Sequence, residues 1–495
     1  MSEYLLEMKS IHKSFSGVHA VNNVDFAIRP GKVMCLVGEN GCGKSTLVKI
    51  ISGVYSRDKG EVWFAGEKIT KMTPAESAQL GIQVIYQDLS IFPNLTVREN
   101  LAINTEIANK KFIINKKRMD RIAQEALNRV RFDVDLDAKM GDLSVAGKQL
   151  IAICRALLFN AKLIIMDEPT TALTRKEVEA LFETVNQLKQ TGISIMFISH
   201  KIEEVLEIAD DVAIMRNGKN VFLGTVDEVT AKDIAFYMTG RDITDEKFEP
   251  KHIDSSPVLE VKNLTCKNGN YKDVSFELHK GEVLGITGLL GSGRTELALS
   301  LFGIIKPQSG DIILNGKKVK ISSPVAAQEL RIGYVPEDRL TEGLCLLQPI
   351  SENIILSSLK ELSRLFGYVK REDVDSVSNK WVDDLSIVTD NVSKFVSMLS
   401  GGNQQKVVLS KWLNTELDIL ILNGPTVGVD IGAKQDIHNL VRGLANEGLA
   451  VIVISDDLPE VVTNCNRVIV MKDGSIVGTM EGDDINEKAI LEIIR

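Results

Sequence analysis

Glycine, lysine and hydroxyl residues with the spacing of a phosphate-binding loop occur near the start of the chain. They are Gly38, Glu39, Asn40, Gly41, Cys42, Gly43, Lys44, Ser45 and Thr46. Apolar stretches precede and follow this run, which is the strand, turn and helix order that such a loop needs. The glycines let backbone N–H groups point at a polyphosphate, and the helix adds its positive N-terminal end. The pattern predicts a nucleotide site, with Lys44 on the β- and γ-phosphates and Ser45 on Mg²⁺.

Two adjacent carboxylates follow a second apolar segment. Asp167 and Glu168 come directly after 163–166, so we expect them at the end of a buried strand beside the phosphate loop. Asp167 suits Mg²⁺, which keeps its water and prefers oxygen ligands. Glu168 suits a general base for an attacking water, an effect of about 10² to 10⁴ in rate. An isolated Asp-Glu-Pro would suggest a helix cap, but the neighbouring phosphate loop favours the chemical roles.

Three further side chains are candidates, and two of them follow predicted strands. Gln87 follows a strand at 82–85 and could contact Mg²⁺ or the attacking water. His200 follows a strand at 193–198 and could bond the γ-phosphate. Phe15 could stack on the base of the nucleotide, although a place in the core is an equally good interpretation. Each of these interpretations depends on the phosphate loop, because none of the residues is diagnostic alone.

The motifs recur in a second copy. Gly288 begins a glycine-rich run 250 positions after Gly38, and Asn423 lies 256 positions after Asp167. Several landmarks that keep register with one small insertion predict two domains of one kind. The expected parts are a first domain at 1–241, a polar linker at 242–257 and a second domain at 258–495.

Each copy alternates apolar strands with amphipathic helices. Near-continuous aliphatic runs predict strands covered on both faces, and apolar residues at helical spacing predict the helices. The strands are expected at 163–166, 193–198, 419–422 and 451–454, and the helices at 117–131, 176–190 and 371–385. The expected fold class is α/β: each copy has a mostly parallel sheet core, an N-terminal antiparallel part and a helical subdomain.

Charge and composition exclude several classes of function. The chain has 495 residues and a formal net charge of −9, which argues against nucleic acid as the main ligand. It shows no apolar run long enough to cross a bilayer, and we expect no signal peptide. Its six cysteines lack a Cys-x-x-Cys pair, which argues against a zinc site and against disulfides and favours a reducing cytoplasm.

Together these motifs resemble the nucleotide-binding domains of ABC ATPases over nearly the whole chain. The narrower resemblance is to the energising subunits of bacterial importers for ribose, galactose and similar simple sugars. It rests on three second-copy motifs: Val-Pro-Glu-Asp-Arg at 335–339, Leu-Ser-Gly-Gly-Asn-Gln-Gln-Lys at 399–406 and Val-Gly-Val-Asp-Ile-Gly-Ala-Lys at 427–434. The resemblance implies two tandem P-loop NTPase domains that hydrolyse ATP with Mg²⁺. It also implies two membrane-spanning permease subunits, an extracytoplasmic sugar-binding protein and a peripheral location on the cytoplasmic face of the inner membrane.

Family members close their two domains head to tail, so the resemblance implies two composite ATP pockets. The first pocket combines the first-copy residues above with Ser400, Gly401, Gly402, Asn403 and Asp430 of the second copy, and every group is intact. The other pocket is degenerate: it has Gly288, Gly293, Arg294, Thr295, Glu337, Asn423, Gly424 and Asp456 on one side and Val145, Ala146 and Thr174 on the other. Family members usually keep Asp-Glu at the positions of Asn423 and Gly424. We therefore expect hydrolysis at one pocket and weak Mg²⁺ affinity at the other.

Two alternatives concern the cargo and the class of protein. The cargo could instead be a nucleoside, a polyol or a signalling furanose, since nothing in this chain contacts it. The other hypothesis is a soluble twin-domain ABC ATPase that acts on ribosomes or DNA. The short linker, the single intact pocket and the absence of a cysteine cluster disfavour it. For a transporter, the expected docking surface for a permease helix is near 87–93 and 337–349.

Overall fold

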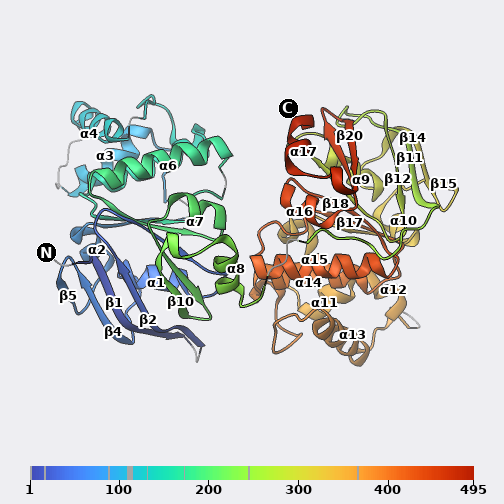
Figure 1. Ribbon diagram of the computed structural model, residues 1–495, viewed down its shortest axis with the longest axis horizontal. Coiled ribbons are helices and arrows are strands. Elements are labelled where there is room, and N and C mark those ends of the chain that lie inside the picture. Colours follow the sequence, from blue (N-terminus) through green and yellow to red (C-terminus); the bar gives the residue numbers. More distant parts are fainter. Residues whose placement is uncertain are drawn as a thin grey trace. The chain divides into compact units, whose positions relative to one another are not determined.

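A computed structural model describes residues 3–15, 18–86, 90–108, 115–130, 132–171, 173–242, 246–364 and 367–494. The chain divides into two compact units, Met1–Ile243 and Thr244–Arg495, which are described separately (Figure 1). The boundary between them falls within the segment expected to be a linker. Part of that segment packs on the second unit: Phe248 is buried in its core, and the Phe248 N–H donates to the Thr463 carbonyl at 2.9 Å.

The first unit is built on two sheets. Within the described residues, the larger sheet has the order β10-β9-β3-β8-β7-β6 and is parallel except for β10. Its strands are β3 (Val33–Val37), β6 (Ile82–Ile85), β7 (Leu163–Asp167), β8 (Ser194–Ser199), β9 (Asp211–Arg216) and β10 (Lys219–Thr225). The smaller, antiparallel sheet has the order β2-β1-β4-β5 and contains β1 (Leu6–Phe15), β2 (Val18–Ile28), β4 (Lys59–Phe64) and β5 (Glu67–Ile69).

Within its described residues, the first unit has eight α-helices. They are α1 (Lys44–Ile51), α2 (Pro74–Leu80), α3 (Val97–Ala108), α4 (Lys116–Arg129), α5 (Val145–Leu158), α6 (Arg175–Gln190), α7 (Ile202–Ile208) and α8 (Ala231–Thr239). Figure 1 shows α3 and α4 at the end of the unit opposite the antiparallel sheet. They form the helical subdomain that the periodicity at 117–131 predicts.

The second unit repeats this plan. Its described sheets have the orders β16-β17-β18-β13-β19-β20 and β12-β11-β14-β15. The strands are β11 (Pro257–Cys266), β12 (Val274–His279), β13 (Val283–Gly288), β14 (Pro307–Leu314), β15 (Lys317–Val319), β16 (Ile332–Val335), β17 (Ile419–Asn423), β18 (Ala450–Ile454), β19 (Arg467–Lys472) and β20 (Ser475–Glu481). The helices are α9 (Arg294–Leu301), α10 (Pro324–Glu329), α11 (Ile350–Ile355), α12 (Leu359–Leu362), α13 (Arg371–Asp384), α14 (Gly401–Leu413), α15 (Ile431–Asn446), α16 (Leu458–Asn464) and α17 (Glu487–Ile494).

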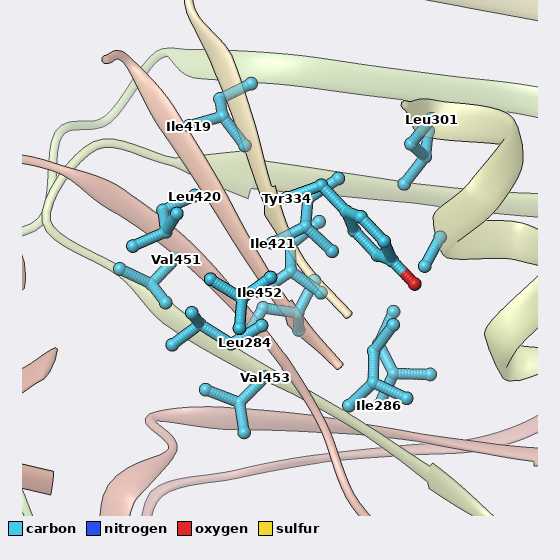
Figure 2. Close-up of a cluster of buried hydrophobic side chains, with 14 of the residues drawn as sticks. Leu284, Ile286, Leu301, Tyr334, Ile419, Leu420, Ile421, Val451, Ile452 and Val453 are labelled. Carbon is cyan, nitrogen blue, oxygen red and sulfur yellow. The ribbon is translucent and has the colours of Figure 1, made fainter. Parts of the chain in front are cut away.

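Aliphatic side chains from the central strands form the core of the second unit. Figure 2 shows Leu284 and Ile286 of β13 beside residues of β17 and β18, with Leu301 of α9 nearby. The labelled aliphatic residues are buried. Because these strands are covered on both faces, their sequences are almost continuously apolar. The core therefore fixes the strand ends from which the site residues project.

The α/β prediction is confirmed for both copies. The four predicted strands at 163–166, 193–198, 419–422 and 451–454 are observed with ends shifted by about one residue, a usual uncertainty in assigning element ends. The three predicted helices are likewise observed as α4, α6 and α13. Within the described residues, we find no helix long and apolar enough to cross a bilayer.

Candidate nucleotide-binding sites

The loop between β3 and α1 is a cradle in which backbone approaches backbone. Gly43 has φ 110°, and a Cβ atom there would lie 2.4 Å from the Ala20 carbonyl oxygen. A Cβ atom on Gly38 would lie 2.4 Å from the Met215 carbonyl oxygen. Both contacts are too short for any side chain, so these positions require glycine. The glycines thus allow the loop to turn so that backbone N–H groups can face an anion.

Lys44 is buried at the start of α1 and is held by the loop itself. Its Nζ donates to the Gly38 carbonyl at 2.6 Å and to the Glu39 carbonyl at 3.0 Å. The next residue, Ser45, is exposed, so its hydroxyl is open to a ligand. The arrangement places one cation and one hydroxyl at the first turn of a helix, as phosphate and metal binding require.

The carboxylates lie at the same edge of the sheet as this loop. Asp167 ends β7, and its neighbour in β8 is Ile198, while Val37 at the end of β3 pairs with Ser199. Burial raises the pKa of Asp167, and the charge of Glu168 raises it further, whereas the charge of Lys44 lowers it. A half-buried carboxylate with a raised pKa gains from a nearby cation. The ends of β3, β7 and β8 therefore lie at one edge of the sheet, with Asp167 among them.

Glu168 and His200 contact each other directly. Nδ1 of His200 lies 3.0 Å from Oε1 of Glu168. This hydrogen bond lowers the pKa of Glu168 and outweighs the opposite effect of burial, so the carboxylate is ionised near neutral pH. Glu168 also has φ 47°, a left-handed backbone that a non-glycine residue rarely adopts. The side chain proposed as a base is thus charged and held in place by the histidine.

A buried glutamate that sequence reasoning missed supports this edge. Glu204 accepts hydrogen bonds from Thr170 Oγ1 at 2.7 Å and from Ser199 Oγ at 3.0 Å. It therefore ties the segment after β7 to the end of β8. In the second unit Glu460 makes the equivalent bonds to Thr426 at 2.9 Å and Ser455 at 2.6 Å. All of these pairs keep the 256-residue offset, so the repeat register could have revealed them.

The corresponding loop of the second unit has a different charge arrangement. Arg294 is buried, its Nη1 donates to the Gly288 carbonyl, and its Nη2 lies 3.5 Å from Oδ2 of Asp456. The arginine is therefore paired with the residue that replaces His200. At the end of β17, Asn423 Nδ2 donates to the Tyr334 hydroxyl at 3.3 Å, and burial raises the pKa of Tyr334 to about 12. Arg294 and Asn423 are thus both engaged in contacts within the second unit.

The second unit also contains the intact Leu-Ser-Gly-Gly-Asn motif. Ser400 precedes α14, and its Oγ accepts a hydrogen bond from Asn403 Nδ2 at 2.9 Å. A Cβ on Gly402 would lie 2.4 Å from the Ala433 Cβ, so the first turn of α14 packs closely on α15. Asp430 caps α15 by accepting from the Ala433 N–H at 2.8 Å. The Ser400 side chain makes no capping hydrogen bond to α14, so the N–H groups of the first turn can serve as donors to an anion.

Two further residues are predicted for the first site. Gln87 lies outside the described residues. Phe15 ends β1 with 39% of its surface exposed, and its ring meets Tyr55 edge-on at 5.1 Å between centroids. An exposed ring at this position is available for stacking on a base, and its role stays a prediction.

Lys411 on α14 gives a pH-dependent prediction. Its Nζ donates to the Gly343 carbonyl at 2.8 Å, and burial lowers its pKa to about 8 from the ordinary 10.5. Between these two values the unfolded chain binds one proton more than the folded chain, so stability rises with pH by about 1.4 kcal/mol per unit. We expect the unfolding free energy of the wild type, minus that of Lys411→Met, to increase by about 2 kcal/mol from pH 8 to pH 9.5.

Urea unfolding followed by tryptophan fluorescence measures this difference in a Trp63→Phe background, where Trp381 and Trp412 report on the second unit. The subtraction removes the other titrating groups, which both proteins share. A difference that does not change with pH would contradict the lowered pKa of Lys411.

Comparisons with known proteins agree with this geometry. The ABC transporter family profile matches residues 21–171 and 271–427. The ribose import ATP-binding protein RbsA 3 of Rhizobium etli is 42% identical over 490 residues, which cover 98% of this chain and 95% of that protein. RbsA of Bacillus cereus, a ribose import ATP-binding protein, is 41% identical and covers 99% of both chains. A relative from Rhizobium johnstonii, named for ribose, galactose and methyl galactoside import, is 40% identical over 99% of this chain and 96% of its own length.

Proposed function

This chain belongs to the ABC transporter family as an ATP-binding subunit with two ABC ATPase domains, and from that premise we propose that it hydrolyses ATP at one composite site to drive import of a simple sugar. The observation that carries the proposal is the difference between its two units. Lys44, Asp167, Glu168 and His200 lie around one phosphate loop, whereas Arg294 and Asp456 pair with each other at the other.

The proposed cycle begins when ATP binds at the loop of the first unit. The Leu-Ser-Gly-Gly-Asn motif of the second unit then completes the site, and its helix N-terminus adds backbone donors to the γ-phosphate. Glu168 accepts a proton from the attacking water, and His200 holds Glu168 and bonds the phosphate. Asp430 is a further residue that the second unit contributes. Hydrolysis releases the two units from each other.

The residues of the first unit fit a bound Mg²⁺. Ser45 is exposed beside the loop, and the pKa of Asp167 is raised by burial and by Glu168, so that carboxylate would gain a counter-charge. Ser45, Asp167 and Gln87 would hold the ion, which neutralises charge on the β- and γ-phosphate oxygens. The second unit fits it poorly, since Asn423 replaces the carboxylate and already bonds Tyr334.

Transport requires partners that span the membrane. We propose two permease subunits and an extracytoplasmic sugar-binding protein, with this chain peripheral on the cytoplasmic face of the inner membrane. The surface near 337–349 suits a permease helix, because Leu340 and Leu347 are 45% and 78% exposed there. The relatives above are named as ATP-binding proteins for import of ribose or of ribose and galactose, which supports a pentose or hexose as cargo.

Sugar uptake tests this function. Cells lacking the chain are given labelled ribose, galactose, a nucleoside and a polyol, and uptake is measured after restoring either the wild type or Glu168→Gln. We expect the wild type to restore uptake of a pentose or hexose and the variant to restore none. Restored uptake of only the nucleoside or the polyol would show that the cargo belongs to that class instead. Uptake independent of the chain would contradict the proposal.

A second glutamate should not create a second active site. A Cβ on Gly424 would lie 3.0 Å from both Glu337 Cγ and Val427 Cγ2, so a larger side chain must displace its neighbours. Asn423 and Asp456 also remain unsuitable for metal and phosphate. We expect the double variant Glu168→Gln/Gly424→Glu to stay as inactive as Glu168→Gln alone in a steady-state ATPase assay. Recovered turnover would show that Gly424 alone disables the second site.

A further inference from the structure

Arg339 connects three segments of the second unit, each of which carries one of the three second-copy motifs. It begins the short helical turn Arg339–Gly343, which follows β16. Its Nη1 donates to the Val427 carbonyl at 2.6 Å and its Nη2 to the Gly428 carbonyl at 3.0 Å. Its Nε lies 3.5 Å from Oε1 of Gln404 on α14. One guanidinium therefore joins the loop before α15 to the first turns of α14.

The guanidinium occupies space that only glycine leaves open. A Cβ on Gly401 would lie 2.8 Å from Nη2 of Arg339 and 2.9 Å from the Gly428 carbonyl oxygen. The first copy has Val145 at the position of Gly401, and in sequence it has Leu89 at the position of Arg339. The arginine and the glycine thus occur together in the copy whose motif is intact, and both are replaced in the copy whose motif is lost.

The neighbouring acidic residue is engaged elsewhere. Oδ1 of Asp338 accepts from the N–H groups of Leu340 at 2.9 Å and Thr341 at 3.2 Å, which caps the helical turn. Burial lowers the pKa of Arg339, and the charge of Asp338 opposes that effect. A partly buried guanidinium bonded to two backbone carbonyls makes charge-assisted hydrogen bonds in a fixed fork geometry. Such contacts determine the position of the acceptors closely.

We propose that Arg339 is a positioning residue for ATP hydrolysis. It holds the N-terminus of α14, with Ser400 and Gly401, against the loop that leads to Asp430, so that these groups meet ATP in one fixed arrangement. The inference rests on the proposed function, in which the second unit completes the site of the first. Arg339 acts through these neighbours and needs no contact with the nucleotide.

Steady-state kinetics of two variants test this role. We expect Arg339→Met to lower kcat roughly 10- to 100-fold, because small displacements of positioned groups have effects of that order. The KM for ATP and the Kd for a fluorescent ATP analogue should stay at wild-type values, because the loop around Lys44 is unchanged. Arg339→Lys, which keeps the charge but lacks the fork, should recover part of kcat. Arg371→Met on α13 is the matched control, since Arg371 is exposed and pairs with Asp375 and Ser393.

Ser400→Ala, measured in parallel, separates the inference from the proposed function. A lowered kcat for Ser400→Ala together with an unchanged kcat for Arg339→Met would overturn only the inference. An unchanged kcat for Ser400→Ala would contradict the proposed composite site, and with it the inference about Arg339. A rise in KM and Kd as large as the fall in kcat would assign Arg339 a structural role instead. If Arg339→Met does not fold, Arg339→Lys decides, and wild-type kcat in that variant overturns the proposal.

Discussion

Glu168→Gln is expected to lower ATP turnover by about 10²- to 10⁴-fold, the range for loss of a general base. The amide is nearly isosteric but cannot accept the proton of the attacking water. ATP binding should persist, because Lys44 and the loop backbone are unaffected and a negative charge close to the phosphates is removed. Single-turnover hydrolysis and equilibrium binding of a fluorescent ATP analogue measure the two effects separately.

Glu177→Gln provides the matched control for that variant. Glu177 also belongs to the first unit, but it caps α6 by accepting from the Thr174 N–H at 2.9 Å. Its replacement should leave turnover unchanged. Turnover of Glu168→Gln close to that of the wild type would contradict the assignment of Glu168 as the base, and lost ATP binding would indicate a role in folding of the loop.

Local spacing made much of the first site predictable. The phosphate loop, the carboxylates at the end of β7 and the histidine after β8 each follow an aliphatic strand, and parallel strands bring their carboxyl ends to one edge. A single sequence therefore indicates which residues gather there. The register of the repeat then identifies the second unit and its substitutions.

Contacts between distant segments were less predictable. The Arg294–Asp456 pair and the Arg339 fork depend on how segments 88 or more residues apart meet, which no local sequence pattern predicts. The polar composition of segment 242–257 predicts a linker, but Phe248 is buried in the core of the second unit. One aromatic residue in a polar stretch is a weak signal in sequence, whereas in the folded unit its burial stabilises the attachment of the residues around it.

Equivalent substitutions in the two phosphate loops should have unequal effects. Lys44→Ala removes the cation that we propose contacts the β- and γ-phosphates, and we expect turnover to fall by about 10²-fold or more, as for loss of a donor to developing charge. Arg294→Ala should leave most turnover intact, because Arg294 serves internal contacts with Gly288 and Asp456. Asp456 is largely exposed, with 72% of its side-chain surface accessible, so water can solvate it when its partner is removed.

Steady-state ATPase rates of the two variants measure this asymmetry. Photolabelling with an azido-ATP analogue, followed by cleavage between the two units, shows which unit retains nucleotide. Label should be lost from the first unit in Lys44→Ala and kept there in Arg294→Ala. Equal losses of turnover would mean that both loops take part in hydrolysis. In that case the internal pairing of Arg294 with Asp456 would have to open during the cycle, and the division between an active and a degenerate site would be wrong.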